Sequence, residues 1–135
     1  MLVDSNIFIF ANDSSYPEWG EARAFFEDSS EELQFNTIIA LESHYGYLRN
    51  LGPSEAERIL RLMFESRILS FYDIERDDVL EGAKISKKYS LKSNDATIVA
   101  SMLRKGITSI ATDNVKDFLS HPGIDVVNPI KRDKS

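Results

Sequence analysis

The sequence predicts an α/β fold built around a parallel β-sheet, and three observations support this class. Short apolar segments of strand length alternate along the chain with longer segments whose apolar residues recur every three or four positions. One or two of these helical segments separate each strand from the next, as the crossover connections of parallel strands require. No internal repeat, low-complexity block or linker interrupts the 135 residues, so we expect one domain.

The first half of the chain begins with Leu2-Val3, a very short apolar pair followed by polar residues. Farther on, Thr37 is expected to cap a helix that Gly52-Pro53 ends. The expected elements are, in order, strand 2–3, a helical turn at 7–11, amphipathic helix 17–28, strand 33–35, helix 38–50 and a helix with an apolar stripe from Ala56 to Phe64.

The second half repeats the alternation of strands and helices. In its first helix, Val79, Leu80, Ala83 and Ile85 are expected to face inward. The expected elements are, in order, strand 68–71, helix 75–89, a helix opened by residues 92–95 and closed by Gly106, strand 107–111, one helical turn at 115–119, strand 124–127 and a polar segment at 128–135.

The composition limits the function classes. Hydrophobic residues make up 42% of the chain and cysteine is absent, which is typical of a globular protein without disulfides or thiolate metal sites. No apolar run approaches the roughly 20 residues of a membrane-spanning helix, and we expect a soluble, cytoplasmic protein. The net charge of −6 argues against binding nucleic acid by simple phosphate neutralisation. Carboxylates gathered around a divalent cation would account for the negative charge, and the bound cation would still attract a phosphate.

Two polar clusters follow expected strands, Asp4-Ser5-Asn6 after the first and Thr112-Asp113-Asn114 after the fourth. Ligands of open parallel sheets bind at the carboxyl ends of strands, so we expect these clusters to lie together. Two further acids occur in helices, Glu42 after four apolar residues and Asp95 near a helix start. A carboxylate with apolar neighbours is costly to bury unless it is paired or binds a metal.

Each acid also has a purely structural interpretation. Asp4 is a suitable residue for the turn that ends a strand, and Asp95 is a suitable helix cap. Glu42 fits an exposed helix position, while Asp113 and Asp117 fit an ordinary turn and a helix start. Their convergence on one edge of one sheet favours a functional site over these separate explanations.

At this point the sequence resembles the PIN-domain family, and within it the VapC-type toxins of prokaryotic toxin–antitoxin pairs. The resemblance covers residues 1–130 and leaves 131–135 as a polar C-terminal tail. It implies a three-layer α/β/α fold with a twisted sheet. The segments that carry it are Leu2-Val3-Asp4-Ser5-Asn6, Ala40-Leu41-Glu42, Asn94 to Ala100, Thr112 to Phe118 and Val126-Val127-Asn128-Pro129.

The resemblance implies a catalytic site of four acids that binds metal, and Asp4, Glu42 and Asp95 match the first three. The family's usual fourth position holds Asn114 here, so the fourth acid is either Asp113 or Asp117. Asp113 is favoured as the further metal ligand. Asn6, Thr112 and Asn114 are expected to support the acids, and Ser5 is a weaker candidate. His44 and His121 are not required.

The implied activity is metal-dependent cleavage of RNA by an endoribonuclease. Carboxylates suit Mg²⁺ or Mn²⁺, and such an ion lowers the pKa of bound water and stabilises a leaving oxygen. A protein antitoxin and a homodimer are further implications, and helix 17–28 is one candidate for the dimer contact. A basic rim would hold RNA, and Tyr89 would stack on a base; the rim comprises Arg49, Lys84, Lys87, Lys88, Lys92, Arg104, Lys105 and Lys116.

Two other interpretations remain open at this point. A catalytically weak PIN-like module would use the same fold to bind a partner or to act in RNA processing. A phosphohydrolase with an aspartyl nucleophile would resemble the haloacid-dehalogenase group, which needs a second aspartate two residues after the first. Asn6 occupies that position here, and this argues against the phosphohydrolase.

Overall fold

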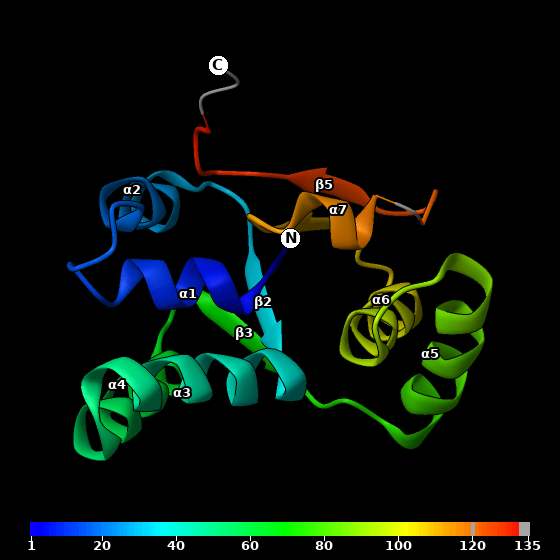
Figure 1. The fold of residues 1–135 in the computed structure, drawn as a ribbon, viewed down its shortest axis with the longest axis horizontal. Helices are drawn as coiled ribbons and strands as arrows, with labels where there is room; N and C mark the ends of the chain where they lie inside the picture. Colours follow the sequence, from blue (N-terminus) through cyan, green and yellow to red (C-terminus); the bar gives the residue numbers. More distant parts are fainter. Residues whose placement is uncertain (120, 133–135) are drawn as a thin grey trace.

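The computed structural model describes residues 1–119 and 121–132, and Figure 1 shows how they are arranged. Five strands form one sheet in the order β3-β2-β1-β4-β5, and each pair of neighbours is parallel. The α/β class with a parallel sheet is therefore confirmed. The strands are β1 (Leu2–Val3), β2 (Leu33–Asn36), β3 (Leu69–Tyr72), β4 (Ser109–Ala111) and β5 (Asp125–Val127).

The helices divide into two groups according to the strands that they connect. The chain steps from β1 to β2 to β3 through four helices, then returns across the sheet to β4 and β5 through three more. Right-handed crossovers place these groups on opposite faces. The helices are α1 (Ser5–Ala11), α2 (Trp19–Asp28), α3 (Thr37–Leu51), α4 (Pro53–Glu65), α5 (Arg76–Tyr89), α6 (Ser93–Lys105) and α7 (Val115–Phe118).

Figure 1 shows α1, α3 and α4 on one side of β2 and β3, with α5 and α6 on the other side. The expected three-layer arrangement is therefore confirmed. The core lies between the layers, where Leu2, Phe8, Phe35, Ile98 and Ile110 are at most 1% exposed. Among the residues described here, no helix is both long enough and apolar enough to cross a membrane.

The direction of the connections changes between β1 and β4, which are neighbours in the sheet. Helices that follow the two strands therefore cover opposite faces and leave a crevice at the carboxyl ends. β1 ends directly before Asp4, and the Asp4 amide donates to the Ala111 carbonyl at 2.9 Å. Two segments about a hundred residues apart in sequence thus end side by side, at Asp4 and Thr112.

One helix face was predicted wrongly. Val79 and Leu80 are 54% and 58% exposed, and Ala83 is also exposed, although Ile85 does pack against the core. The face of α5 that meets α6 instead contains Asp78 and Gly82. An added Cβ at Gly82 would lie 2.8 Å from the Cα of Thr97 in α6, so the two backbones are in close contact. Apolar periodicity pointed to the wrong side because a glycine and a paired carboxylate form the interface.

A partly buried ion pair joins α5 to α6. The Arg104 guanidinium donates to both Asp78 oxygens, at 2.8 and 2.9 Å, and the Asp78 side chain is 2% exposed. Burial raises the pKa of Asp78, but hydrogen bonds from Arg104 and from the Glu75 amide outweigh it and leave the pKa below its usual value. Because Arg104 pairs with Asp78, its expected place in a basic rim loses support and stays a prediction.

Some element boundaries also differ from the prediction. Asn36 rather than Thr37 caps α3, because the Asn36 side chain accepts from the Ile39 amide at 3.1 Å. The Thr37 hydroxyl accepts instead from the Ile74 amide at 3.0 Å, which ties the start of α3 to the segment after β3. Helix α2 begins at Trp19, two residues after the expected start at Pro17.

The end of the chain contacts the domain at two described residues of the segment expected as a polar tail. The Lys131 amide donates to Glu21 at 2.7 Å, and Arg132 pairs with Asp113. Residues 133–135 lie outside the described part of the chain. The expected boundary at residue 130 remains a prediction.

We predict that Gly82→Ala lowers the free energy of unfolding by about 1–3 kcal/mol, because the new methyl group would press against the Thr97 backbone. Denaturant unfolding followed by circular dichroism measures this change. Gly20→Ala is the matched control, since nothing lies within 4 Å of a Cβ at that position. The control should stabilise the protein by about 0.5–1 kcal/mol, and equal effects of the two substitutions would contradict the close packing of α5 on α6.

Candidate active site

Asp4 is 4% exposed and lies between the end of β1 and the start of α1. Its Oδ1 accepts from the Ser5 amide at 2.8 Å and caps α1, while its Oδ2 accepts from the Thr112 hydroxyl at 2.7 Å. Burial raises the pKa of Asp4, and the charge of Asp117 raises it further, although these hydrogen bonds partly offset the increase. The carboxylate is therefore held in a fixed orientation but is short of positive charge.

Asn6 and Thr112 form the support around Asp4. The Asn6 amide group donates to Asp4 Oδ2 at 3.4 Å and to the Thr112 hydroxyl at 3.2 Å. The Thr112 hydroxyl also accepts from the Asn114 amide at 3.0 Å, and Asn6 Oδ1 accepts from the Asp113 amide at 3.1 Å. The ends of β1 and β4 are thus locked together by side chains as well as by the sheet.

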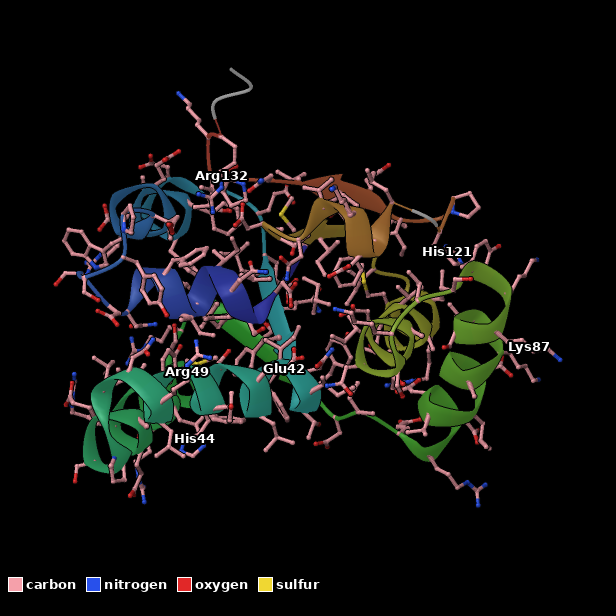
Figure 2. All side chains as sticks on the ribbon, viewed as in Figure 1. Glu42, His44, Arg49, Lys87, His121 and Arg132 are labelled. Atoms are coloured by element: carbon pink, nitrogen blue, oxygen red, sulfur yellow. The ribbon has the colours of Figure 1, made fainter. Side chains whose placement is uncertain are left out.

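Glu42 reaches the same region from α3. Its two carboxylate oxygens each accept one hydrogen bond at 3.3 Å, from the Ser5 hydroxyl and from the Asn94 side-chain amide. Burial raises the pKa of Glu42, and the charge of Asp4 adds to the increase. Figure 2 shows Glu42 and His44 on opposite sides of α3, so this histidine does not face the acids.

Asp95 lies in the first turn of α6, whose N-cap residue is Lys92. Burial raises the pKa of Asp95 to about 7, with further contributions from Asp117, Asp4 and Glu42, in that order. Lys92 opposes the increase. No side-chain hydrogen bond caps α6 among the described residues, so a simple capping role does not account for Asp95. Burial is thus the largest cause of the raised pKa of Asp95, and repulsion from the three other carboxylates adds to it.

The two candidates for the fourth acid lie in different surroundings. Asp117, in α7, lines an open cavity of about 390 Å³, and its charge raises the pKa of Asp4 and of Asp95. The Asp113 carboxylate instead accepts hydrogen bonds from Arg132 and from the Asn128 side chain. The hydrogen bonds from Arg132 are the largest factor that lowers the pKa of Asp113. The cavity is lined by Glu42, Lys92, Ser93, Asn94, Asp95, Asn114 and Asp117.

The donor atoms of this cavity suit a hard divalent cation. Among the described residues, no group of three or more acids or histidines is arranged so that it could hold a metal ion by itself. Mg²⁺ nevertheless keeps several water ligands and needs one or two carboxylates, so a closed cage is not required. The raised pKa values of Asp4, Glu42 and Asp95 indicate uncompensated negative charge, which a cation would neutralise. The residues therefore fit Mg²⁺ or Mn²⁺.

The sequence profile of the PIN domain matches residues 1–121, and the chain belongs to this family. Solved structures of similar fold include the sarcin–ricin-loop-cleaving toxin VapC20 of Mycobacterium tuberculosis, with 17% identity, a TM-score of 0.75 and coverage of 84% of this chain and 89% of that one. A toxin–antitoxin complex from Klebsiella pneumoniae has 24% identity and a TM-score of 0.71, covering 97% and 98%.

DNA-bound VapBC from Salmonella typhimurium is also similar, with 17% identity, a TM-score of 0.73 and coverage of 95% of this chain and 96% of that one. No curated protein matches the sequence significantly. At these identities the solved structures establish the fold, and the family assignment comes from the PIN-domain match.

Sequence reasoning overlooked three side chains that the structure places around the acids. Asn94 binds Glu42, whereas Asn128 and Arg132 bind Asp113. Asn94 directly precedes Asp95, and that adjacency was a signal available in the sequence. Nothing in the local sequence connects Arg132 with Asp113, because their contact depends on the path of the chain after β5.

We predict that Asp95→Asn raises the thermal stability of the metal-free protein at pH 8. The folded-state pKa of Asp95, about 7, lies above its ordinary 3.8, so the folded state binds this proton more tightly than the unfolded state. Ionised Asp95 therefore destabilises the fold above pH 7, and this cost shrinks as the pH falls from 7 toward 4. With solvent screening, about 1–2 kcal/mol, or ~3–8 °C in Tm, is expected at pH 8.

Differential scanning fluorimetry with a chelator present measures this effect, and Glu31→Gln, at an exposed position, controls for the loss of one charge. A stabilisation by Asp95→Asn that is equally large at pH 4 and pH 8 would show that repulsion among the acids is not its cause.

Proposed function

We propose that this protein is a divalent-metal-dependent endoribonuclease, using Mg²⁺ or Mn²⁺, and the toxin of a toxin–antitoxin pair. The observation that carries the proposal is the gathering of Glu42, Asp95 and Asp117 around one cavity, with the buried Asp4 near enough for its charge to raise the pKa of Glu42 and Asp95. Membership of the PIN-domain family supports it independently. A site kept for structure alone would gain nothing from four mutually repelling carboxylates.

The proposed chemistry is hydrolysis of an RNA phosphodiester bond that leaves 5′-phosphate and 3′-hydroxyl ends. A bound cation would supply positive charge to the phosphate and acidify a water molecule. Asp4 and Asp95 would hold the cation, and Glu42 would bind it or orient the attacking water. We place Asp117 rather than Asp113 as the fourth acid, because Asp117 faces the cavity while Arg132 occupies Asp113.

The supporting side chains have separable roles in this scheme. Thr112 and Asn6 fix the orientation of Asp4, while Ser5 and Asn94 fix that of Glu42. Preorganised ligands need no rearrangement when the cation and the phosphate bind, which lowers the cost of reaching the transition state.

The RNA contacts of the proposal rest on Lys92, which lines the cavity beside the acids. The wider basic rim has less support. Lys87 projects from the outer side of α5 in Figure 2, and Lys84 pairs with Glu81 at 3.1 Å. Tyr89 packs against His121, with ring centroids 4.8 Å apart, so a base would have to displace this contact. We therefore propose that the cation, together with Lys92, provides most of the phosphate binding.

An antitoxin partner is proposed because the similar structures include a toxin–antitoxin complex and DNA-bound VapBC. The cytoplasmic location is part of the same proposal. A homodimer is proposed as well, but at a different surface from helix 17–28, whose Phe25 and Phe26 pack against the core. Leu41, Tyr45 and Leu48 form an exposed apolar stripe along α3, 66%, 65% and 40% exposed.

We predict that Tyr45→Glu converts a dimer into a monomer, because a charge in this stripe would have to be desolvated on association. Size-exclusion chromatography with light scattering measures the mass. Leu62→Glu is the matched control, since Leu62 is 51% exposed on α4, outside the stripe, and it should leave the mass unchanged. A parent protein that elutes as a monomer at micromolar concentration would sink the dimer proposal.

The central prediction concerns cleavage of RNA in millimolar Mn²⁺. We expect Asp4→Asn, Asp95→Asn and Asp117→Asn to reduce kcat/KM by about 100-fold or more, since each removes a carboxylate from the cation site. The assay is electrophoresis of end-labelled RNA, with circular dichroism to show that each variant is folded. Asp125→Asn, at an exposed position in β5, should cleave at the parent rate.

The alternatives give different outcomes in the same assay. A PIN-like binding module would leave every RNA intact even when the parent protein is folded and saturated with Mn²⁺. An aspartyl phosphohydrolase would form a trappable phosphoaspartate on Asp4, which family membership and the Asn at position 6 both oppose. An Asp95→Asn variant that cleaves RNA as fast as the parent would exclude the proposed site.

A further inference from the structure

The C-terminal segment after β5 returns to the body of the domain and binds it through several contacts. Ile130 is 3% exposed, and its amide donates to the Asn128 side chain at 2.9 Å. The Lys131 amide donates to Glu21 in α2 at 2.7 Å. Figure 2 shows Arg132 in the same region, beside α2 and β5. The segment therefore has a defined path that brings a guanidinium group to the loop between β4 and α7.

Arg132 binds that loop through an ion pair with the Asp113 carboxylate. Its Nε donates to Asp113 Oδ1 at 3.1 Å, and a second guanidinium nitrogen donates to Oδ2. The Asn128 side chain donates to the same Oδ1 at 3.1 Å, and Arg132 also lies 3.8 Å from Glu18. The side chains of Asp113 and Glu18 are 15% and 12% exposed and that of Arg132 is 50% exposed, so the arginine lies at the surface while its acidic partners are largely covered.

A series of hydrogen bonds connects the Arg132–Asp113 pair with Asp4, which is 4% exposed. The Asp113 amide donates to Asn6 Oδ1 at 3.1 Å, and Asn6 donates in turn to Asp4 Oδ2. Thr112, the residue before Asp113, donates to the same Asp4 oxygen at 2.7 Å. The position of the Asp113 backbone therefore governs two of the donors that orient Asp4.

We propose that Arg132 is a positioning residue of the active site, which fixes Asp4 by holding the loop from Thr112 to Asn114 in place. The bidentate ion pair also keeps the Asp113 carboxylate turned away from the cavity, so that Asp117 lines the cavity instead. Arginine suits the task because its planar guanidinium pairs with both carboxylate oxygens, which a lysine ammonium does not match. The proposal rests on the nuclease function proposed above for its effect on cleavage.

The test compares Arg132→Ala with Lys131→Ala, a neighbouring substitution that removes the same charge but preserves the backbone contact of Lys131. In ¹H–¹⁵N spectra of the full chain without metal, Arg132→Ala should shift the Asp113 amide and the Asn6 side-chain amide. Its apparent Kd for Mn²⁺, measured by electron paramagnetic resonance, should rise about 10-fold or more. Lys131→Ala should leave both measurements at their parent values.

A double-mutant cycle identifies the route of the effect. Asp113→Ala should weaken Mn²⁺ binding about as much as Arg132→Ala, and the double variant should be no weaker than either one. Arg132→Lys should fall between parent and Arg132→Ala, and it also serves if the alanine variant does not fold. The proposal is overturned if Arg132→Ala leaves the Asn6 and Asp113 resonances in place, or if Asp113→Ala abolishes Mn²⁺ binding while Arg132→Ala does not.

These readouts separate failure of this proposal from failure of the nuclease proposal. If the parent neither binds Mn²⁺ nor cleaves RNA, the nuclease proposal fails, while the Asn6 and Asp113 resonances still decide whether Arg132 positions the loop. If the parent cleaves RNA and Arg132→Ala cleaves equally well with unchanged resonances, the nuclease proposal stands and the positioning role is excluded.

Discussion

The burial of acidic side chains near the junction of β1 and β4, to which repulsion among them adds, is the constraint around which this molecule is organised. Asp4 is almost completely buried, and burial raises its pKa and that of Asp95 the most, while the charge of Asp117 raises both further. Like charges at close range in a poorly solvated crevice oppose folding unless something compensates for them. The sheet brings Asp4 to this place because its strand order reverses direction there, and the helices bring the other acids to the same opening.

The surrounding structure restrains Asp4 and Glu42 with hydrogen bonds from neutral groups, while the charge of Lys92 acts on Asp95. Asp4 accepts from Ser5, Asn6 and Thr112, and Glu42 accepts from Ser5 and Asn94. Neutral donors fix the orientation of a carboxylate without cancelling its charge. The main cationic pair, Arg104 with Asp78, lies elsewhere and fastens α5 against α6, the helix that carries Asp95. Negative charge is therefore preserved at the opening and neutralised where the helices pack.

The acidic character of the chain is consistent with a nucleic-acid substrate when a cation mediates the contact. A net charge of −6 opposes RNA binding, and Lys92 is the basic residue that lines the cavity. A divalent ion held by the acids would reverse the local sign and direct phosphate to one place. Binding and cleavage would then depend on the same ion, because the acids with raised pKa values are the proposed ligands of that ion.

The amino-acid sequence determined the parallel α/β architecture, because apolar periodicity and short strand segments report directly on which faces are buried. It also pointed to Asp4 and Glu42, since the carboxyl ends of parallel strands and a carboxylate among apolar residues are recognisable locally, and the family resemblance added Asp95. Only the tertiary structure showed that Asp117, and not Asp113, lines the cavity. It also showed that α5 packs against α6 through Asp78 and Gly82. These outcomes depend on partners distant in sequence, above all Arg132 and Arg104, and local patterns contain no information about such partners.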